Sequence, residues 1–383
     1  MADLPALPPA ARPGDAITAI DTPALVLDLD TFERNLDAMQ AAASAADVAL
    51  RPHAKAHKTP AIALAQLQRG AVGICCQKVS EALPFLQAGV ADIHISNQTV
   101  GPAKATLLAQ LARHGRFSVC VDHVQQVADL AAATAAQGSQ LRVFIEIDIG
   151  QGRCGVADAP AVLRLLDALA PHPQLQFGGL QAYQGGVQHV RGHAQRRDAA
   201  ARAAERTAAV VAALAAAGVA CPVVTGGGSG SVEFDLASGV YTELQPGSYV
   251  FMDGDYGRNE AGAALHFDHS LFIASTVMSV GGGGRCILDA GLKSLAVDSG
   301  LPTLWQGGAA SATLAYTAAN DEHGIVRLVD GAPAGAALPP LGSQLLLVPG
   351  HCDPTLNLHD QLVAVRGGVV QALWPVAARG FSR

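Results

Sequence analysis

Short apolar runs alternate with longer alanine-rich stretches over the first two thirds of the chain. The apolar runs have the length of buried β-strands, and six of the seven gaps between them carry a helical pattern. The last gap predicts no more than a helical turn. This alternation predicts a β/α barrel, with a doubly wound open sheet as the alternative. The predicted strands are 48–55, 71–76, 92–96, 117–122, 141–148, 177–183, 221–225 and 239–244.

Two helices carry recognisable end signals. Asp30 precedes a helical pattern and has Glu33 three residues later, which predicts an N-cap at Asp30 with a capping box. The longest helical pattern runs from Ala194 to Ala217, and Gly218 is expected to end it.

Polar side chains follow many of the predicted strands directly. This placement favours the barrel, because barrel enzymes build their sites at the carboxyl ends of the strands. The residues concerned are Lys55, Gln77, Lys78, Asn97, Asp122, Arg153, Tyr183 and the glycines after Thr225.

The pattern changes near residue 270. The runs at 270–280, 285–292, 324–329, 343–350 and 361–370 are predicted strands separated by glycine-rich turns, with little helical pattern. We therefore expect a barrel domain over 27–270 and a mostly β-domain over 271–383. The glycines at 281–284 are a flexible turn and not a phosphate loop, because no strand-to-helix transition follows them.

Composition limits the kinds of partner and compartment. Half of the 383 residues are hydrophobic and 15% are charged, which excludes a disordered chain. With a net charge of −7 and no basic block, no nucleic-acid partner is expected. No apolar run is long enough to span a membrane, and the N-terminus lacks a secretion signal pattern. Most of the seven cysteines lie in apolar runs, so we expect reduced thiols in a cytoplasmic protein.

Lysine is scarce, which shortens the search for an amine nucleophile. The five lysines are Lys55, Lys58, Lys78, Lys104 and Lys293. Lys55 ends the first predicted barrel strand, where desolvation and neighbouring cations can lower the pKa of an amine enough for it to condense with a carbonyl. The segment around it, taken alone, favours a solvated basic turn instead.

Two glycine-rich segments suggest anion binding. Residues 225–231 (TGGGSGS) offer consecutive backbone N–H groups and hydroxyls after the seventh strand, where barrels often hold phosphate. A plain glycine turn is the alternative, and the position favours phosphate. After the fifth strand, Arg153 could bind a phenolate or carboxylate, or could be an exposed arginine of an ordinary turn.

The segment His351-Cys352-Asp353 follows an apolar run. In an extended chain residues i and i+2 point to the same side, so His351 and Asp353 could share a metal with Cys352 facing away. An imidazole and a carboxylate are more typical of a site for Mn²⁺, Mg²⁺ or Co²⁺ than of a zinc site rich in thiolates. Two ligands are few, so water, substrate, Asp321 or His323 would complete the site; without further context a polar turn is favoured.

Eight segments, in order, resemble the D-threonine aldolase group of the D-serine dehydratase-like enzymes, which share the alanine racemase fold (fold type III of the pyridoxal-phosphate enzymes). The resemblance runs from about Thr22 to the C-terminus, and it implies that the N-terminal strand (within 1–26) joins the β-domain and that the protein is a homodimer. The segments are RPHAKAHK, GICCQKVSEA, EIDIGQGRCGV, GLQAYQG, TGGGSGS, ELQPGSY, NDEHG and PGHCD.

The resemblance implies a role for each matching residue. Lys55 would carry pyridoxal 5'-phosphate as a Schiff base, Arg153 would contact its phenolic oxygen, and Tyr183 would lie beside its ring. His351 and Asp353 would bind a divalent metal, with Mn²⁺ expected first and Mg²⁺ or Co²⁺ as alternatives. The phosphate would be held by Thr225, Gly226, Gly227, Gly228, Ser229, Gly247 and Ser248.

The expected reaction is retro-aldol cleavage of a small D-3-hydroxy-amino acid, such as D-threonine or D-allo-threonine, to glycine and an aldehyde. His189 is the candidate base, with a metal-bound water as the rival. A D-serine or D-threo-3-hydroxyaspartate dehydratase is the main alternative, although the dehydratase branch has H-x-C where this chain has H-x-D. A racemase would need a second base, for which Tyr316 is the only tyrosine after residue 270, and a non-catalytic cofactor-binding protein would need no β-domain. Gln245 stands where racemases have an arginine near the cofactor's pyridine nitrogen.

Overall fold

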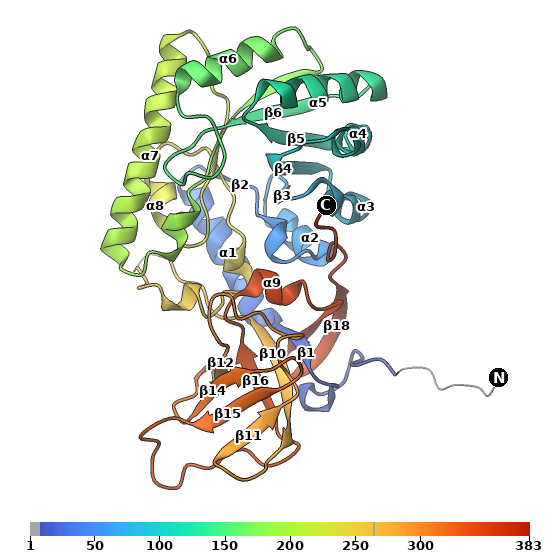
Figure 1. Cartoon of the computed structure of the whole chain (residues 1–383), viewed down its shortest axis with the longest axis vertical. Helices are drawn as coiled ribbons and strands as arrows, with labels where there is room; N and C mark the ends of the chain where they lie inside the picture. The colour runs from blue at the N-terminus through green and yellow to red at the C-terminus, as the bar shows by residue number, and fades with distance from the viewer. Residues whose placement is uncertain (1–7, 263–264) are drawn as a thin grey trace, which may run out of the picture. The chain divides into compact units, whose positions relative to one another are not determined.

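The protein is described by a computed structural model that covers residues 8–262 and 265–383. The chain forms two compact units. The barrel unit contains Leu36–Tyr249, the residues around 258–267, and Ala377–Arg383. The β unit contains the chain up to Asn35, Val250–Gly257 and Asp268–Val376. Each unit is therefore assembled from segments that are far apart in the sequence (Figure 1).

The barrel unit contains all eight predicted strands, and the predicted fold class is confirmed. They form one parallel sheet in the order β2-β9-β8-β7-β6-β5-β4-β3. The sheet closes because the chain after β2 also bonds to β3: Val72 N–H donates to Leu50 O at 2.8 Å and Cys75 N–H to Pro52 O at 2.8 Å. The strands are β2 (Ala49–Leu50), β3 (Ile74–Cys76), β4 (Asp92–Gln98), β5 (Arg116–Val121), β6 (Leu141–Glu146), β7 (Leu175–Ala182), β8 (Val224–Gly226) and β9 (Glu243–Leu244).

Helices separate the strands as the periodicity predicts. The long predicted helix is α7, and the short last gap holds the six-residue α8. Gly218 follows α7 with a φ of +77°, a left-handed conformation that glycine adopts without steric cost. The helices are α1 (Leu29–Ala45), α2 (Pro60–Gln68), α3 (Ala82–Gln87), α4 (Pro102–Leu111), α5 (Val124–Gln137), α6 (Ala159–Leu169), α7 (His193–Ala216) and α8 (Val232–Ala237).

The predicted cap of α1 was wrong. Asp28, and not Asp30, caps the helix, because its Oδ1 accepts the backbone N–H of Thr31 at 2.7 Å. Asp30 lies within the first turn, where it pairs with Arg366, and Glu33 pairs with the same guanidinium at 2.8 Å. Asp30 and Glu33 have the spacing of a capping box, but both side chains form ion pairs with Arg366, which is distant in the sequence.

The β unit is a mostly antiparallel sheet that includes the first strand of the chain. β1 (Ala24–Asp28) pairs antiparallel with β10 and parallel with β17, and Figure 1 shows β1 beside β10. The sequence did not predict β12, β13 and β14, since their alanine-rich and glycine-rich surroundings lack a period-two pattern. The other strands are β10 (Leu271–Ser279), β11 (Arg285–Leu288), β12 (Thr303–Gln306), β13 (Ala309–Ala310), β14 (Leu314–Ala319), β15 (Gly324–Leu328), β16 (Gln344–Val348), β17 (Gln361–Arg366) and β18 (Val369–Pro375).

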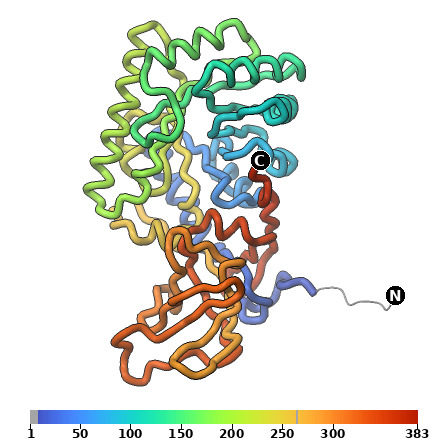
Figure 2. The backbone as a smooth tube through the Cα atoms, in the orientation of Figure 1, coloured from blue at the N-terminus to red at the C-terminus, as the bar shows by residue number. Residues whose placement is uncertain are grey.

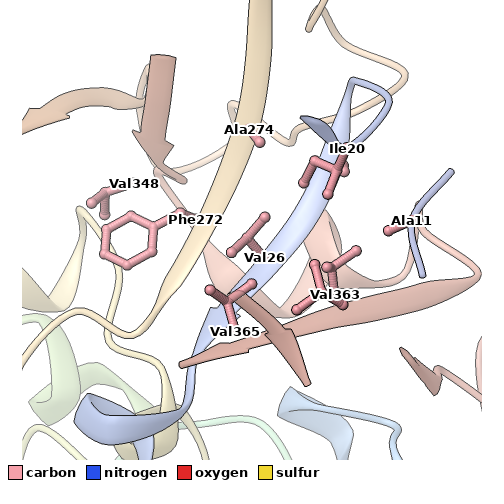
Figure 3. Close-up of a cluster of buried hydrophobic side chains, with 10 residues drawn as sticks. Ala11, Ile20, Val26, Phe272, Ala274, Val348, Val363 and Val365 are labelled. Carbon is pink, nitrogen blue, oxygen red and sulfur yellow. The ribbon is translucent and has the colours of Figure 1, made fainter. Parts of the chain in front are cut away.

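Alanine, valine and isoleucine residues and one phenylalanine form a buried cluster in the β unit. Val26 of β1 packs with Phe272 of β10 and Val363 of β17, and all three are at most 6% exposed (Figure 3). Because these residues come from both ends of the chain, the N-terminal strand is part of the core of the β unit.

The last seven residues belong to the barrel unit. Ala378 N–H donates to Lys58 O at 3.0 Å, and Ser80 Oγ donates to the carbonyl oxygens of Phe381 and Arg383 at 3.1 and 2.7 Å. The C-terminus accordingly lies near α2 and α3 (Figure 2). In residues 8–262 and 265–383 no helix has both the length and the apolar character needed to cross a membrane.

Candidate functional site

Lys55 lies in a short turn beyond the end of β2. The predicted strand is shorter than expected, and Lys55 falls in the 3₁₀ turn η2 (Ala54–Ala56). The turn is held by His53, whose Nδ1 accepts the Lys55 backbone N–H at 3.3 Å and whose Nε2 is 2.8 Å from Ser96 Oγ at the end of β4. The backbone of this half-buried lysine is thereby held at the carboxyl ends of the barrel strands.

Lys58, the lysine nearest to Lys55 in the sequence, forms a buried ion pair. Lys58 is buried, has a φ of +46°, and pairs with the buried carboxylate of Glu81. Glu81 also accepts the backbone N–H groups of Gln77 and Lys78 at 3.0 and 3.1 Å. Lys293 pairs with Glu322 at 2.6 Å on the surface of the β unit. Lys58 and Lys293 are therefore each paired with a carboxylate away from the Lys55 turn.

The glycine-rich segment after β8 packs so closely that side chains do not fit. A Cβ at Gly226 would lie 1.8 Å from Ala182 O, and one at Gly228 would lie 2.6 Å from Gln188 Oε1. Gln188 organises the loop: its Oε1 accepts Gly230 N–H at 2.8 Å and its Nε2 donates to Ser231 Oγ at 2.8 Å. The sequence did not predict this role, since Gln188 differs in no local way from other polar residues of its loop.

A second loop, after β9, joins the first one to the Lys55 turn. Ser229 Oγ accepts the backbone N–H of Tyr249 at 2.9 Å. A Cβ at Gly247 would lie 3.2 Å from both His53 O and the Cβ of Ala56. Gly247 and Ser248 are thus brought against the turn that carries Lys55, and the structure gathers both candidate phosphate loops beside it.

Two of the candidate phosphate residues have other partners. The Thr225 hydroxyl donates to Glu243 Oε1 at 2.8 Å and accepts from Gln245 Nε2 at 2.8 Å, inside the barrel. The backbone N–H of Gly228 faces Asp235, whose pKa burial raises to about 7 even though hydrogen bonds from Ser231 and Gly228 oppose the shift.

Arg153 and Tyr183 come together on neighbouring loops. The Arg153 guanidinium carbon lies 5.4 Å from the centroid of the Tyr183 ring, a cation–π arrangement. Gln151 Oε1 ties the loops by accepting Gly185 N–H at 2.8 Å. The Arg153 loop turns around Asp148, and the N–H groups of Gly152 and Gly150 lower the pKa of that carboxyl. His189 ends the 3₁₀ turn η4 (Gly185–His189) and is exposed.

A buried polar network crosses the barrel interior. Arg51 binds Asp92 at 2.6 Å and Glu243 at 3.0 Å. Burial and the nearby Arg51 charge lower the pKa of His94 to about 3, so this imidazole is neutral. Gln245 exchanges two amide hydrogen bonds with Gln181, at 2.8 and 3.2 Å. Polar residues inside apolar strands, such as His94, are the sequence signal that could have predicted this network.

The extended-chain argument for the His351-Cys352-Asp353 segment was wrong. His351 is extended, with φ −143° and ψ 121°, but the short helix α9 (Cys352–Leu356) begins at the next residue. Cys352 is fully buried, which raises its thiol pKa, and its Sγ donates to Asp353 Oδ1 at 3.3 Å. His351 Nδ1 lies 2.7 Å from Asp298 Oδ2. No group of three metal-ligating side chains gathers in the part of the chain that the structure describes, so Asp321 and His323 add no such cluster.

Tyr316 is not placed as a second base. Its hydroxyl donates to Ala290 O at 2.9 Å, and burial raises its pKa to about 12. The hydroxyl of the tyrosine that the racemase hypothesis requires is therefore bonded to the backbone of the β unit.

Two regions of the chain match known protein families. Residues 27–255 match the N-terminal domain of alanine racemase, and residues 270–365 match a putative serine dehydratase domain. The chain thus combines an alanine racemase-type barrel with a dehydratase-type β-domain.

The whole chain has close relatives. It is 56% identical to a D-threonine aldolase from an Arthrobacter species, over 99% of this chain and 98% of that one. It is 43% identical to a 3-hydroxy-D-aspartate aldolase from Paracoccus denitrificans, over 99% and 96%. The crystal structure of D-threonine aldolase from Filomicrobium marinum matches with a TM-score of 0.93 and 47% identity, over 98% and 100%. D-threo-3-hydroxyaspartate dehydratase from Delftia matches with a TM-score of 0.85 and 30% identity, over 94% and 98%.

The chain belongs to the D-threonine aldolase family of lyases with the alanine racemase fold. Membership of this family implies pyridoxal phosphate and a divalent metal as cofactors.

Proposed function

We propose that this protein cleaves D-3-hydroxy-α-amino acids of the D-threonine and D-allo-threonine type to glycine and an aldehyde. The observation that carries the proposal is the packing of the Lys55 turn against Gly247, in a chain 56% identical along its length to a D-threonine aldolase. The turn that carries Lys55 and a candidate anion-binding backbone are then side by side, which supports a phosphate cofactor linked to that lysine.

The residues fit pyridoxal phosphate. The close packing of Gly226 leaves room only for backbone beside Ala182, and a bound phosphate would be held by 226–229 with Gly247 and Ser248. Lys55 would bind the aldehyde carbon, Arg153 the phenolic oxygen, and Tyr183 would flank the ring. When bound, this cofactor withdraws electrons from the α-carbon of the amino acid attached to it.

The donor set of the β unit fits a divalent ion. His351 supplies an imidazole nitrogen and Asp353 a carboxylate, a pair that suits Mn²⁺, with Mg²⁺ or Co²⁺ as alternatives. A divalent ion lowers the pKa of a hydroxyl bound to it.

Three side chains of this protein would carry out the proton transfers and the anion binding of the reaction. His189 accepts the proton of the substrate's β-hydroxyl, so that the Cα–Cβ bond can break. Lys55 returns a proton to Cα, which completes glycine. The Arg153 guanidinium, which lies over the Tyr183 ring, would bind the phenolic oxygen of the cofactor.

The free state of all seven cysteines supports a cytoplasmic enzyme. The family resemblance supports a homodimer acting on small molecules without nucleic-acid or membrane partners. Sedimentation of the pure protein measures the oligomeric state.

The decisive experiment incubates the protein with D-threonine, with and without a chelator. Glycine and acetaldehyde that disappear on chelation are expected. Ammonia and 2-oxobutanoate would overturn the aldolase in favour of the dehydratase, and L-threonine or allo-threonine would indicate epimerisation. Lys55→Ala should abolish product, whereas the exposed Lys104→Ala is the matched control.

The dehydratase is the second candidate because the Delftia dehydratase shares the fold at a TM-score of 0.85. A cysteine-to-alanine variant of that enzyme has been solved in a metal-free form. This chain has Asp353 where the dehydratase branch has cysteine, and its higher identity to the aldolase supports the first candidate.

A further inference from the structure

His351 has a carboxylate on one side of its ring. Its Nδ1 lies 2.7 Å from Asp298 Oδ2, across 53 residues of sequence. Ser299 Oγ is 3.3 Å from the same carboxylate oxygen and 3.5 Å from Nδ1. A carboxylate only accepts hydrogen bonds, so Nδ1 carries the hydrogen, and in the neutral ring with this tautomer Nε2 has the lone pair.

The backbone around this pair is held from both sides. A Cβ at Gly350 would lie 2.0 Å from Gly300 O, so the turn that carries Asp298 packs directly on the residue before His351. On the other side, Cys352 N–H donates at 2.8 Å to the buried Asp253 carboxylate. Asp253 also accepts the backbone N–H of Tyr256 at 2.9 Å. The 2.7 Å contact is therefore between two anchored segments of the β unit.

We propose that Asp298 is a positioning residue for the metal ligand His351. By accepting Nδ1–H it selects the tautomer whose Nε2 can bind a divalent ion, and it fixes the plane of the ring. The inference rests on the proposed function, since it takes His351 as a ligand.

Stability alone does not account for the pair. The side chains of Asp298 and His351 are 54% and 30% exposed. Exposed ion pairs contribute little to stability, so removal of this one changes folding little. The contact instead determines which nitrogen of the His351 ring carries the hydrogen. This matters for a histidine that binds a metal ion through its other nitrogen.

The test compares Mn²⁺ binding by the full chain and its variants, with free Mn²⁺ followed by electron paramagnetic resonance. Asp298→Ala is expected to weaken binding by about 10- to 100-fold. Asp298→Asn keeps a neutral acceptor and should recover part of the affinity. Asp330→Asn, an exposed carboxylate of the same unit, is the matched control and should bind as the unaltered protein does.

A second measurement needs no metal. Nitrogen-15 NMR of histidine-labelled protein should show His351 protonated at Nδ1, and Asp298→Ala should shift the ring toward protonation at Nε2. An unchanged tautomer would overturn the inference, as would unchanged Mn²⁺ affinity in Asp298→Ala when His351→Ala loses binding. If the unaltered protein and His351→Ala bind Mn²⁺ equally, the metal assignment of the proposed function fails instead.

Discussion

The hydroxyl oxygen of Ser229 accepts the backbone N–H of Tyr249 at 2.9 Å. This bond links the glycine loop after β8 to the loop after β9, and the second loop packs on the turn of Lys55 through Gly247. Three segments of the candidate cofactor site are thus joined, two of them by the Ser229 hydroxyl and the third by the packing at Gly247.

Ser229→Ala should disturb that coupling. Tyr249 is 2% exposed, so its N–H would lose its partner in a buried place, at a cost of about 1–3 kcal/mol in the free energy of unfolding. Pyridoxal phosphate should dissociate several-fold faster, which absorbance after dilution measures. Ser238→Ala is the control, because Ser238 Oγ accepts Val240 N–H at 3.2 Å at the end of α8, outside both loops. Equal cofactor loss in both variants would contradict the prediction.

Lys55 and Lys58 should differ sharply when replaced. Lys55→Ala is expected to lose the covalent link to the cofactor, seen as no mass increase after borohydride reduction. Lys58→Ala should keep the link but lose about 3–5 kcal/mol of stability, because it leaves the Glu81 carboxylate buried without its cation. A retained link in Lys55→Ala would show that another amine carries the cofactor.

Arg51→Met should destabilise the barrel strongly. Arg51 is 4% exposed and pairs with Asp92 and Glu243, and its loss leaves Glu243 charged and buried. Urea denaturation should report a loss of about 3–5 kcal/mol. The exposed pair of Arg197 with Asp198 provides the comparison, and Arg197→Met should cost less than about 1 kcal/mol. Similar losses in the two variants would mean that the buried pairing adds nothing.

Asp235 should make stability fall as the pH rises. Its pKa is raised from 3.8 to about 7 in the folded chain, so between these values the folded state holds a proton that the unfolded state has released. The corresponding stability is present at low pH and is lost as the pH rises through about 7. Asp235→Asn does not titrate, so its free energy of unfolding should improve relative to the unaltered protein by roughly 3 kcal/mol from about pH 5 to pH 8.

Denaturation curves of both proteins across this range check the sign. Only the difference between them is used, since other groups titrate in both. A difference that stays constant with pH would contradict the expected shift.

Much of the barrel could be predicted because its signals are local. Apolar runs of strand length, helical periodicity and glycine positions depend on residues close in sequence, so all eight strands and the end of α7 were found. The place of Lys55 after a strand is also a local feature, but it gave only a preference among the lysines, and the resemblance of its segment to the family motif made the choice. The alanine-rich strands β12 to β14 lacked such a pattern and were missed.

Other features depended on contacts between distant segments. Asp28 and Asp30 are nearly equivalent as local capping residues, but in the folded chain Asp28 caps α1 and Asp30 pairs with Arg366. The Ser229–Tyr249 and Asp298–His351 contacts join residues 20 and 53 positions apart, for which periodicity carries no information. Secondary structure could be predicted from the sequence because local sterics and burial act over a few residues. Side-chain partners were decided by the tertiary structure, because only the folded backbone brings their atoms within hydrogen-bond distance.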